Sequence, residues 1–507
     1  MYISEKIKDD YKLWQAGDIV FIDSGTGSGK SLFIRKQLSD WAASNFEQIL
    51  ILVNRIELKQ QIDDILQRHN NMTIKTATYQ SIEHDNSFDY TRFKYIVCDE
   101  CHYFTEDSPF NLNSNVSLQI IKNLNSHIRI LMSATGDTVF NHMAITQNNK
   151  VFRYTLKRDF SNILTLSFYN NKKSIESVER FVEHRFPNEV DKIIWFCKSV
   201  KQAAALHEQY PNSSFMCSKS QKKYVHLITD NMIINDGEKI TFKGKWLFTT
   251  NVLDNGFDFK DDNIKLIICD YPDINSVLQC IGRKRKLHSE DNLHIVLANY
   301  DNRAISGIVT DIKNTLAQAQ AIIDGERELY IKLVGKFGNK SKYIVMDVVQ
   351  DKGHGFDKKV STPKYLKVKS DYETYTYMLS EQRDINKLRK LNGEKKQNDG
   401  YKQFMKNLLN KKVVYDLDDD YKKDDLDRYL SKLVNIKLFN AEQKELIDKI
   451  AAKDNGRLIK AIGALNNKLS KQGLNYIIKS DKDKRRKLED GSVNKNRLKT
   501  YWIVSTL

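Results

Sequence analysis

The sequence lacks the segments with which a protein crosses or enters a membrane. Nowhere in its 507 residues is there an apolar run of about 18 residues, the length that spans a bilayer as a helix. The stretch Met1–Glu5 also lacks the basic and then apolar layout of a signal peptide. We therefore expect a soluble, cytoplasmic protein with no membrane partner.

Cysteine is also scarce, with six residues in the whole chain. Most of them lie in apolar, strand-like segments, which favours reduced and buried thiols over a disulfide framework. Cys98 and Cys101, followed by His102, have the spacing of a covalent haem site or of half a zinc site. Because no second Cys/His pair lies nearby in the sequence, we favour a different role for this segment.

Acidic residues are outnumbered mainly in the C-terminal part of the chain. The 81 Lys and Arg residues against 65 Asp and Glu residues give a net charge of +16. Residues 1–300 hold 37 basic and 36 acidic side chains, whereas residues 301–507 hold 44 and 29. This asymmetry indicates a C-terminal region that binds a polyanion such as a nucleic acid.

The length of the chain predicts three or four domains.

A glycine-rich turn near the N-terminus has the pattern of a phosphate-binding loop. Residues 23–31 read Asp-Ser-Gly-Thr-Gly-Ser-Gly-Lys-Ser, between an apolar segment at 19–22 and a helical pattern that begins at Leu32. In such a loop, backbone N–H groups cradle the phosphates of a nucleotide, the lysine reaches the β- and γ-phosphates and the next hydroxyl holds Mg²⁺. Lys30 and Ser31 take these two positions.

The strict form of this loop begins with glycine, whereas this chain has Ser24. A small residue there, followed by x-Thr-Gly-x-Gly-Lys-Ser, resembles the loop of superfamily 2 helicases and translocases. Further along, an apolar segment at 93–97 leads into Asp-Glu-Cys-His at 99–102, which resembles the Asp-Glu-x-His box of DEAH-type helicases. Asp99 is predicted to hold Mg²⁺ through its water shell, and Glu100 to polarise the attacking water.

Shorter motifs lie between and after the phosphate loop and the Asp-Glu-Cys-His segment. Asn54–Gln61 resembles motif Ia of the superfamily, and Thr78–Ser81 resembles its contact to the nucleic-acid strand. Ser133-Ala134-Thr135 follows an apolar segment and resembles motif III, whose hydroxyl pair couples the γ-phosphate site to the second lobe. The resemblance implies nucleic-acid contacts by Arg55, Thr78 and Gln80, and coupling roles for His102, Ser133 and Thr135.

A second α/β unit follows a basic link at residues 157–159. Within it, Asn251–Phe259 resembles motif V, and Ser276–Lys286 resembles motif VI, Gln-x-x-Gly-Arg-x-x-Arg. The resemblance makes Arg283 an arginine finger. The last arginine of the pattern is replaced by Lys286, with Arg285 one residue earlier, so either of these two is the second finger. Further implied roles are catalysis for Gln279, nucleotide binding for Gly256 and Asp258, and nucleic-acid binding for Thr249 and Thr250.

Seven motifs in this order across residues 24–286 resemble a superfamily 2, DEAD/DEAH-like helicase. The resemblance implies ATP as the nucleotide and two tandem RecA-like lobes of α/β fold with parallel sheets, which we expect at residues 1–158 and 159–305. Neither lobe hydrolyses ATP alone, because one holds the phosphates and Mg²⁺ while the other supplies guanidinium groups. The predicted nucleotide-binding residues of lobe 1 are Ser24, Gly25, Thr26, Gly27, Ser28, Gly29, Lys30 and Ser31.

The remaining chain is predicted to be mainly helical and basic. Residues 306–440 form a mixed accessory region, with short β-like runs within 343–368. In residues 441–507, with 16 basic and 8 acidic side chains, an amphipathic helix at 458–469 precedes alternating segments at 474–478 and 498–504. This order resembles the end of a winged helix, although a basic hairpin that closes a helical bundle explains it nearly as well. The predicted phosphate contacts are Lys482, Lys484, Arg485, Arg486 and Lys487.

The sequence therefore predicts an ATP-dependent DNA helicase that couples hydrolysis to translocation and strand separation on single-stranded or forked DNA. A duplex-DNA translocase, a remodelling ATPase or an RNA helicase would carry the same motifs. A scaffold with a degenerate ATPase core is disfavoured by the intact Lys30, Asp99, Glu100 and Arg283. High Lys, Asn and Ile usage indicates an AT-rich bacterial, phage or mobile-element genome, where replication, repair and defence all use such motors.

Overall fold

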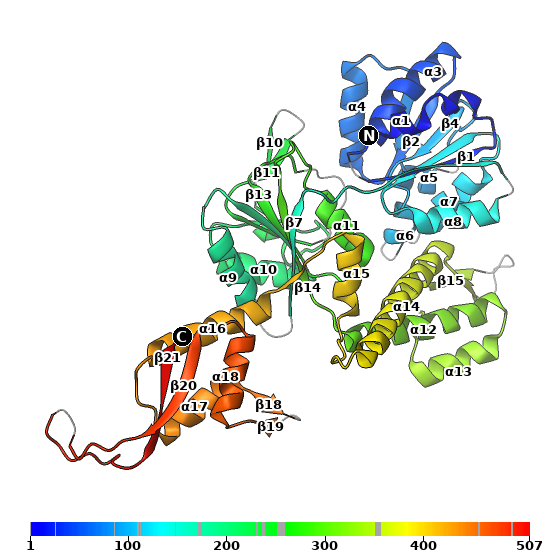
Figure 1. Ribbon diagram of the computed structural model, residues 1–507. Coiled ribbons are helices and arrows are strands. Elements are labelled where there is room, and N and C mark those ends of the chain that lie inside the picture. Colours follow the sequence, from blue (N-terminus) through cyan, green and yellow to red (C-terminus); the bar gives the residue numbers. More distant parts are fainter. Residues whose placement is uncertain are drawn as a thin grey trace. The chain divides into compact units, whose positions relative to one another are not determined.

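A computed structural model divides the chain into two compact units (Figure 1). The first unit contains Met1–Ser167 and Asn188–Val414, and the second contains Phe168–Pro187 and Tyr415–Leu507. Both predicted lobes fall within the first unit, apart from residues 168–187; the predicted boundaries at residues 158, 305 and 440 stay predictions. The structure describes residues 2–25, 27–85, 87–108, 111, 113–147, 149–170, 175–229, 232–235, 239–250, 259–349, 356–454, 457–487 and 490–507.

Lobe 1 is built on a parallel sheet with the strand order β3-β2-β4-β5-β1-β6. Val20 and Ile22 of β1 pack into one apolar core cluster, whereas Ile19 and Phe21 pack into another. Apolar side chains thus alternate between two buried faces, as expected for a parallel sheet covered on both sides. The strands are β1 (Ile19–Ser24), β2 (Ile49–Val53), β3 (Ile74–Thr78), β4 (Tyr95–Cys98), β5 (Ile128–Ser133) and β6 (Val151–Leu156).

Helices cover both faces of this sheet. The helical run after the phosphate loop consists of α2, a π-helical turn at Ile34–Leu38, and α3. A short 3-10 helix at Asp10–Leu13 precedes β1. The helices are α1 (Ile3–Ile7), α2 (Lys30–Phe33), α3 (Ser39–Ser44), α4 (Ile56–Arg68), α5 (Tyr79–His84), α6 (Tyr103–Glu106), α7 (Ser114–Asn123) and α8 (Asp137–Thr146).

The strand order of lobe 1 brings three sequence motifs to one edge of the sheet. Strands β4, β5 and β1 are parallel neighbours, so their carboxyl ends lie side by side. The phosphate loop follows β1, Asp99 and Glu100 follow β4, and Ser133 ends β5. Ligand sites of open α/β sheets form at this edge. Motifs that are distant in the sequence therefore meet in space.

Lobe 2 contains a second sheet, whose strands in the first unit follow the order β7-β14-β13-β8-β12-β9. Strand β12 pairs in parallel with β8 and β9, and β13 pairs in parallel with β8 and β14. A separate antiparallel hairpin joins β10 and β11. The elements are β7 (Ile163–Tyr169), β8 (Lys192–Phe196), α10 (Val200–Gln209), β9 (Ser214–Phe215), a 3-10 helix at Val225–Leu227, β10 (Met232–Asn235), β11 (Lys239–Phe242), β12 (Trp246–Thr249), β13 (Ile264–Cys269), α11 (Ile274–Gly282) and β14 (Leu293–Ala298).

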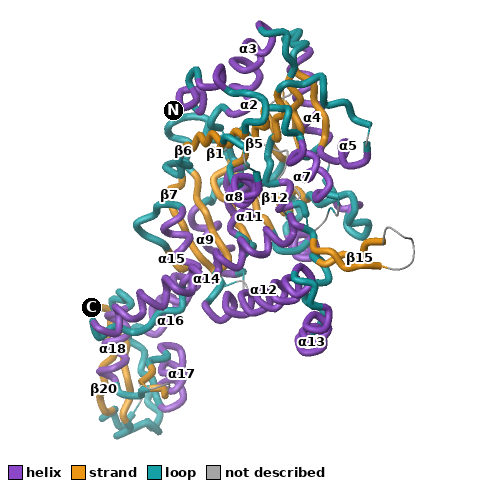
Figure 2. The backbone as a smooth tube through the Cα atoms, turned by 90° about the vertical axis from the view of Figure 1, so that its right-hand side faces the viewer, coloured by secondary structure: helices purple, strands orange, loops and turns teal. Residues whose placement is uncertain are grey.

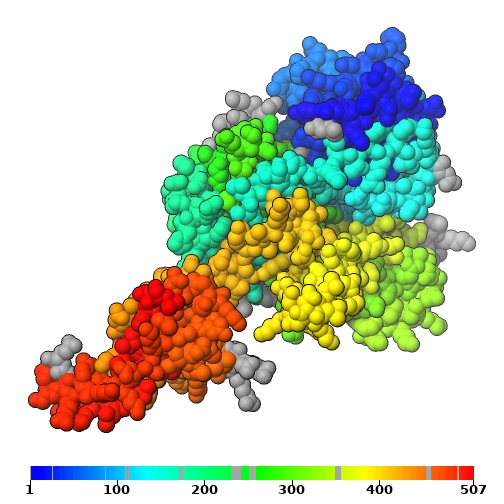
Figure 3. All heavy atoms as spheres, in the orientation of Figure 1, coloured from blue at the N-terminus to red at the C-terminus, as the bar shows by residue number. Residues whose placement is uncertain are grey.

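Long helices and one hairpin complete the first unit. Helices α12 and α14 lie side by side in both backbone views (Figures 1 and 2). Helix α14 also contacts α6, α7 and α8 of lobe 1, and the yellow surface of this region adjoins lobe 1 directly (Figure 3). The elements are α12 (Asn302–Ile323), α13 (Arg327–Phe337), β15 (Val345–Val349), β16 (Phe356–Val360), α14 (Thr362–Leu391) and α15 (Gly400–Leu408).

The prediction of β-like structure up to residue 368 is wrong beyond Val360. Helix α14 begins at Thr362, and Pro363 lies in its first turn. Proline fits that position because the first N–H groups of a helix have no partner within the helix. The proline therefore starts a helix here and does not interrupt a strand.

The second unit combines helices with an antiparallel strand pair. Its apolar core includes Leu430 of α16, Leu446 of α17 and Leu465 of α18, together with Ile478 of β20 and Val504 of β21. Tyr476 pairs with Thr506 at one end of the β20–β21 ladder, and Lys482 with Thr500 at the other. The elements are α9 (Glu176–Arg185), β17 (Tyr415–Asp416), α16 (Leu417–Leu433), α17 (Asn440–Ile450), β18 (Lys453–Asp454), β19 (Arg457–Leu458), α18 (Ile462–Lys471), β20 (Tyr476–Lys482) and β21 (Thr500–Thr506).

The predicted helix at 458–469 is present but begins later, at Ile462. Leu458 instead pairs with Lys453 in the short β18–β19 ladder, and the N–H of Ile459 donates to the carbonyl of Ala452. These backbone hydrogen bonds compete with a helical start. The helix ends at Lys471, and Gly473 beyond it has a φ of +66°, a left-handed region that glycine reaches without strain.

The predicted fold class is confirmed in its main parts: two parallel α/β lobes are followed by a mainly helical region. The helix, strand, basic turn and strand at the C-terminus are present, and the winged-helix assignment stays a prediction. None of the described helices combines the length and the apolar character that crossing a bilayer requires.

Candidate functional site

The phosphate loop joins β1 to α2. Gly27 and Gly29 have φ values of +80° and +86°, a left-handed conformation that glycine adopts without steric cost. The ammonium of Lys30 donates to the carbonyl of Ser24 at 2.7 Å and to that of Gly25 at 3.1 Å. The hydroxyl of Ser28 also donates to the carbonyl of Gly25, at 2.8 Å. The loop is thus folded around the ammonium of Lys30.

Two further residues of this loop are predicted to bind the nucleotide. Ser31 is exposed in the first turn of α2. Thr26 lies outside the described residues.

Asp99 and Glu100 lie in a tight turn beyond β4. Glu100 has a φ of +48°, which is sparsely populated for a residue other than glycine. Its N–H donates to Oδ1 of Asp99 at 3.1 Å, and the N–H of Cys101 donates to the carbonyl of Met132 at 2.9 Å. These bonds hold the strained turn.

The two carboxyl groups differ in their electrostatics. Burial, helped by the charge of Glu100, raises the pKa of Asp99 above its ordinary value. Burial also opposes the ionised form of Glu100, but its hydrogen bond to His102 and the nearby charges of His102, Lys30 and Arg283 hold its pKa below the usual range. A buried carboxyl group with a raised pKa gains from a cation beside it. Asp99 therefore fits the predicted role of holding Mg²⁺.

A chain of polar side chains links Glu100 to lobe 2. Nδ1 of His102 lies 3.2 Å from Oε2 of Glu100 and 2.8 Å from the hydroxyl of Ser133. The hydroxyl of Ser133 accepts from the N–H of Thr135 at 2.9 Å. Nε2 of Gln279, on α11, then donates to the hydroxyl of Thr135 at 3.4 Å. We name these five residues the interlobe chain.

His102 is the buried centre of this chain. Burial opposes its positive charge, but the hydrogen bond and the negative charge of Glu100 raise the pKa of His102. Its other ring nitrogen, Nε2, is buried and has no hydrogen-bond partner among the described residues. Cys98 and Cys101 are buried, free thiols whose pKa values are raised by burial. The Cys-x-x-Cys-His segment thus contains the Asp-Glu turn and the residues that directly follow it.

The basic residues of motif VI point in different directions. Arg283 is buried directly after α11, and a Cβ built at Gly27 would lie 3.7 Å from Nη1 of Arg285. Lys286 is exposed, and its Nζ lies 3.5 Å from the hydroxyl of Ser161. Arg285 therefore reaches the phosphate loop, whereas Lys286 faces the segment between the lobes. This placement favours Arg285 as the second finger.

A cavity of about 560 Å³ lies between these elements. Its size is within the range of about 300–1,000 Å³ that small-ligand sites occupy. The described lining includes Gly27, Ser28, Glu100, His102, Thr135, Gln279, Arg283 and Arg285, together with Arg158, Asp159 and Phe160. The motifs of both lobes thus enclose one space that fits a nucleoside triphosphate.

Arg158 is a cavity residue that the sequence motifs missed. Its guanidinium donates to the carbonyl of Ala134, and burial lowers its pKa. A Cβ built at Gly25 would lie 3.5 Å from Cγ of Arg158, so the side chain runs along the phosphate loop. The sequence holds a signal for it, because the basic link at 157–159 follows β6, the strand that pairs with β1.

The predicted nucleic-acid contacts of lobe 1 also lie at the carboxyl ends of strands. Arg55 follows β2 and forms an ion pair of 3.3 Å with Asp107. The hydroxyl of Thr78, at the end of β3, accepts from the N–H of Ser81 and caps α5. The side chain of Gln80 donates to the carbonyl of Asn54 at 3.2 Å. Each of the three already has a partner within the lobe.

The remaining predicted contacts are spread over lobe 2 and the second unit. Thr249 and Thr250 are buried at and just beyond the end of β12. Gly256 and Asp258 of motif V lie outside the described residues. The basic turn after β20 is exposed, and its predicted contacts are Lys482, Lys484, Arg485, Arg486 and Lys487.

Comparison with known proteins agrees with the motifs of lobe 1. Residues 2–138 match the family model of the Type III restriction enzyme, res subunit. This segment carries the phosphate loop, the Asp-Glu turn and the Ser-Ala-Thr turn. The match confirms the predicted resemblance for this lobe, which is a P-loop ATPase lobe of the superfamily 2 helicase type. A comparison with curated proteins found no match.

Two solved structures are similar to part of this chain. The DEAH/RHA helicase HrpB of Escherichia coli is 13% identical with a TM-score of 0.39, over 59% of this chain and 42% of that chain. Dbp5 of S. cerevisiae, bound to RNA and ADP BeF3, is 15% identical with a TM-score of 0.41, over 64% of this chain and 84% of that chain. The chain thus spans less than half of the E. coli helicase.

Proposed function

We propose that this protein is an ATP-dependent helicase that acts on DNA and couples hydrolysis to translocation and strand separation. The observation that carries the proposal is the interlobe chain, which runs from Glu100 through His102, Ser133 and Thr135 to Gln279 across the cavity. A change at the γ-phosphate therefore has a route of direct contacts to lobe 2. Such coupling is what turns hydrolysis into movement of two lobes along a strand.

In this proposal, lobe 1 binds the nucleotide and positions water. The N–H groups of the loop and the ammonium of Lys30 bind the phosphates, and Ser31 and Asp99 would hold Mg²⁺. Mg²⁺ would neutralise charge on the β- and γ-phosphates. Glu100 accepts the proton of the attacking water, and its hydrogen bond to His102 orients the carboxylate.

Lobe 2 supplies the positive charge that the transition state needs. Arg283 follows α11 at the cavity wall, and Arg285 reaches the phosphate loop from the same segment. Their guanidinium groups stabilise the charge that develops on the γ-phosphoryl group when the lobes close. Gln279, which bonds to Thr135, senses that closure.

The second unit is proposed to bind the DNA backbone through its basic turn. Asp483 is buried at the base of this turn, where it accepts from Lys437 at 3.0 Å and from the N–H of Arg485 at 3.1 Å. Asn494 closes the turn by donating from its side chain to the carbonyl of Arg485 at 3.0 Å. The turn is therefore a folded structure that displays exposed cations, which suits contacts to phosphates.

Neutralising this turn is expected to weaken DNA binding without changing maximal hydrolysis. The sharpest variant replaces Lys482, Lys484, Arg486 and Lys487 with glutamine and keeps Arg485, because Arg485 bonds to Asp483. Each lost phosphate contact on duplex B-DNA reduces the magnitude of the slope of log K against log salt by about 0.9, so with duplex DNA the slope should fall by up to about 3.6. Fluorescence anisotropy of labelled DNA over a salt series measures both affinity and slope.

A matched control removes the same charge elsewhere in the second unit. Lys422, Arg428, Lys432 and Lys444 are exposed on α16 and α17. Their replacement with glutamine is expected to leave the salt slope within experimental error of the wild type. Equal effects of the two variants would mean that net charge, and not the basic turn, attracts DNA.

The proposal as a whole is tested by ATP hydrolysis with no nucleic acid, single-stranded DNA, duplex DNA and RNA at one salt concentration. We expect the largest stimulation with single-stranded DNA. Stimulation by RNA alone would make the protein an RNA helicase, and an equal rate in all four samples would exclude a nucleic-acid motor. A role in replication, repair or defence is supported only if DNA stimulates ATP hydrolysis in this assay.

A further inference from the structure

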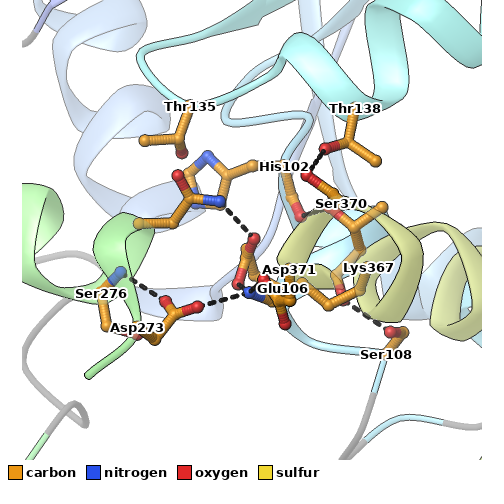
Figure 4. Close-up of polar contacts among 12 residues, drawn as sticks. His102, Glu106, Ser108, Thr135, Thr138, Asp273, Ser276, Lys367, Ser370 and Asp371 are labelled. Carbon is orange, nitrogen blue, oxygen red and sulfur yellow. Dashed lines mark hydrogen bonds and ion pairs between the residues drawn. The ribbon is translucent and has the colours of Figure 1, made fainter. Parts of the chain in front are cut away.

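Lys367 of α14 lies in a cluster of carboxylates beside the interlobe chain (Figure 4). Its Nζ lies 2.6 Å from Oδ2 of Asp273 and 2.7 Å from Oδ1 of Asp371. It also lies 3.3 Å from Oε2 of Glu106. The side chain of Lys367 is only 12% exposed, so these contacts are largely shielded from water.

The carboxylates around Lys367 come from three different parts of the first unit. Glu106 ends α6, the short helix that follows His102 of lobe 1. Asp273 precedes α11 of lobe 2 and caps it, because its Oδ1 accepts from the N–H of Ser276 at 2.8 Å. Asp371 is one turn along α14 from Lys367 itself. One ammonium thus joins lobe 1, lobe 2 and the accessory helices.

Both lobe elements lead directly to the catalytic segments. Helix α6 begins at Tyr103, immediately after His102, and α11 ends at Gly282, immediately before Arg283. A second link runs directly between them, because Nδ2 of Asn275 donates to Oε1 of Glu106 at 2.9 Å. The end of α6 and the start of α11 are therefore held together, and neither Glu106 nor Asn275 is in the described lining of the nucleotide cavity.

Helix α14 is anchored to lobe 1 by more than Lys367. The hydroxyl of Thr138, on α8, donates to the hydroxyl of Ser370 at 3.0 Å. A smaller cavity of about 240 Å³ adjoins this contact, with Thr135, Asp273, Ser370 and Asp371 in its lining. Lobe 1, α11 and α14 therefore meet at one junction.

The electrostatics of the cluster favour a permanent positive charge at its centre. Burial opposes the charge of Lys367, but Asp273, Glu106 and Asp371 outweigh it and raise the pKa of the ammonium well above its ordinary value. Burial raises the pKa of Asp371 to about 7, although Lys367 opposes this shift. Loss of the ammonium would leave Glu106 and Asp273 to repel each other across the junction.

We propose that Lys367 is a positioning residue for ATP hydrolysis, which ties α6 to the start of α11 so that lobe closure brings Arg283 to the γ-phosphate. The inference rests on the proposed function and adds the accessory helix α14 as a working part of the motor. The described lining of the nucleotide cavity does not include Lys367, so its effect runs through α6 and α11. It should therefore change kcat and leave nucleotide binding to lobe 1 intact.

The test compares Lys367→Met, which removes the charge at similar length, with Lys367→Arg, which keeps it. We expect Lys367→Met to lower the kcat of DNA-stimulated hydrolysis about tenfold, within the usual range of coupling between sites. The affinity for a fluorescent ATP analogue should stay within about twofold, because the contacts of lobe 1 to phosphate are retained. Lys367→Arg should recover most of the rate. The control is Lys369→Met, which removes an exposed lysine from the same helix.

A second readout measures closure itself. Ile145 of lobe 1 and Val190, which precedes β8 of lobe 2, are 83% and 65% exposed, and the six native cysteines are buried. Cysteines introduced at these two positions can therefore carry a donor and an acceptor dye. The change in energy transfer on addition of ATP and DNA should be reduced in Lys367→Met and normal in Lys369→Met.

The outcomes separate the inference from the proposed function. A wild-type protein without DNA-stimulated hydrolysis would refute the proposed function. An active wild type, with normal kcat and normal closure in Lys367→Met, would overturn the role of Lys367 alone. If the melting temperature shows that Lys367→Met is unfolded in the assay, the inference is tested with Asn275→Ala instead. Loss of the hydrogen bond from Asn275 to Glu106 should lower kcat about threefold. An unchanged kcat in folded Asn275→Ala would overturn the inference.

Discussion

Replacement of Arg283 with alanine is expected to lower the kcat of ATP hydrolysis by about 10³-fold or more, the effect of a lost arginine finger in other NTPases. The guanidinium follows α11 at the wall of the cavity, and its interaction strengthens as charge develops on the γ-phosphoryl group. The affinity for ATP should change little, because Lys30 and the loop N–H groups still bind the phosphates. Steady-state kinetics and equilibrium binding of a fluorescent analogue measure the two quantities separately.

Arg285→Ala and Lys286→Ala give this prediction its internal comparison. Arg285 reaches Gly27 of the phosphate loop, whereas Lys286 contacts Ser161. We therefore expect a clear loss of kcat for Arg285→Ala and a nearly normal kcat for Lys286→Ala. Normal turnover in all three variants would remove the two-lobe mechanism. The reverse order of Arg285 and Lys286 would show that the segment rearranges when ATP binds.

Replacement of Glu100 with glutamine is expected to lower kcat by about 10²-fold or more, which is the usual contribution of a general base. Glutamine has the same shape and can keep the hydrogen bond to His102, but it cannot accept the proton of water. Nucleotide binding should persist in this variant. A rate equal to that of the wild type would contradict the role of Glu100.

Lys30→Ala is the contrasting variant. Its ammonium is buried in the loop and bonded to the carbonyls of Ser24 and Gly25, so alanine removes the charge that meets the phosphates. We expect loss of both binding and hydrolysis. Tight binding by Lys30→Ala would place the phosphates elsewhere in the cavity.

The parts of the site that the sequence predicted are those with short, contiguous patterns. The loop before Lys30, the Asp99-Glu100 turn and the segment around Arg283 each follow or begin a regular element, so apolar periodicity was enough to place them. Parallel sheets then bring the ends of neighbouring strands together, which explains why separate motifs form one cavity.

The parts that the sequence did not predict depend on contacts between distant segments. Lys367 is one lysine in a charged helix, and nothing in its local pattern distinguishes it from the exposed Lys369. Its place in the cluster is set by ion pairs with Glu106 and Asp273, which are far away in the sequence and in different lobes. The local sequence around Arg158 likewise predicts only a basic link, because its contact to Ala134 joins segments that are distant in the sequence. Helix α18 begins later than the sequence predicts, because the backbone of Leu458 pairs with Lys453 in a short β ladder.

ATP-driven displacement of a strand from a forked DNA tests the central claim most directly. The assay is run with the wild type and Glu100→Gln, beside displacement of a triplex strand from intact duplex DNA. A DNA helicase should release the strand of the fork with ATP, and Glu100→Gln should not. Release of the triplex strand without release from the fork would show a duplex translocase, and no ATP-dependent release from either substrate would contradict the account.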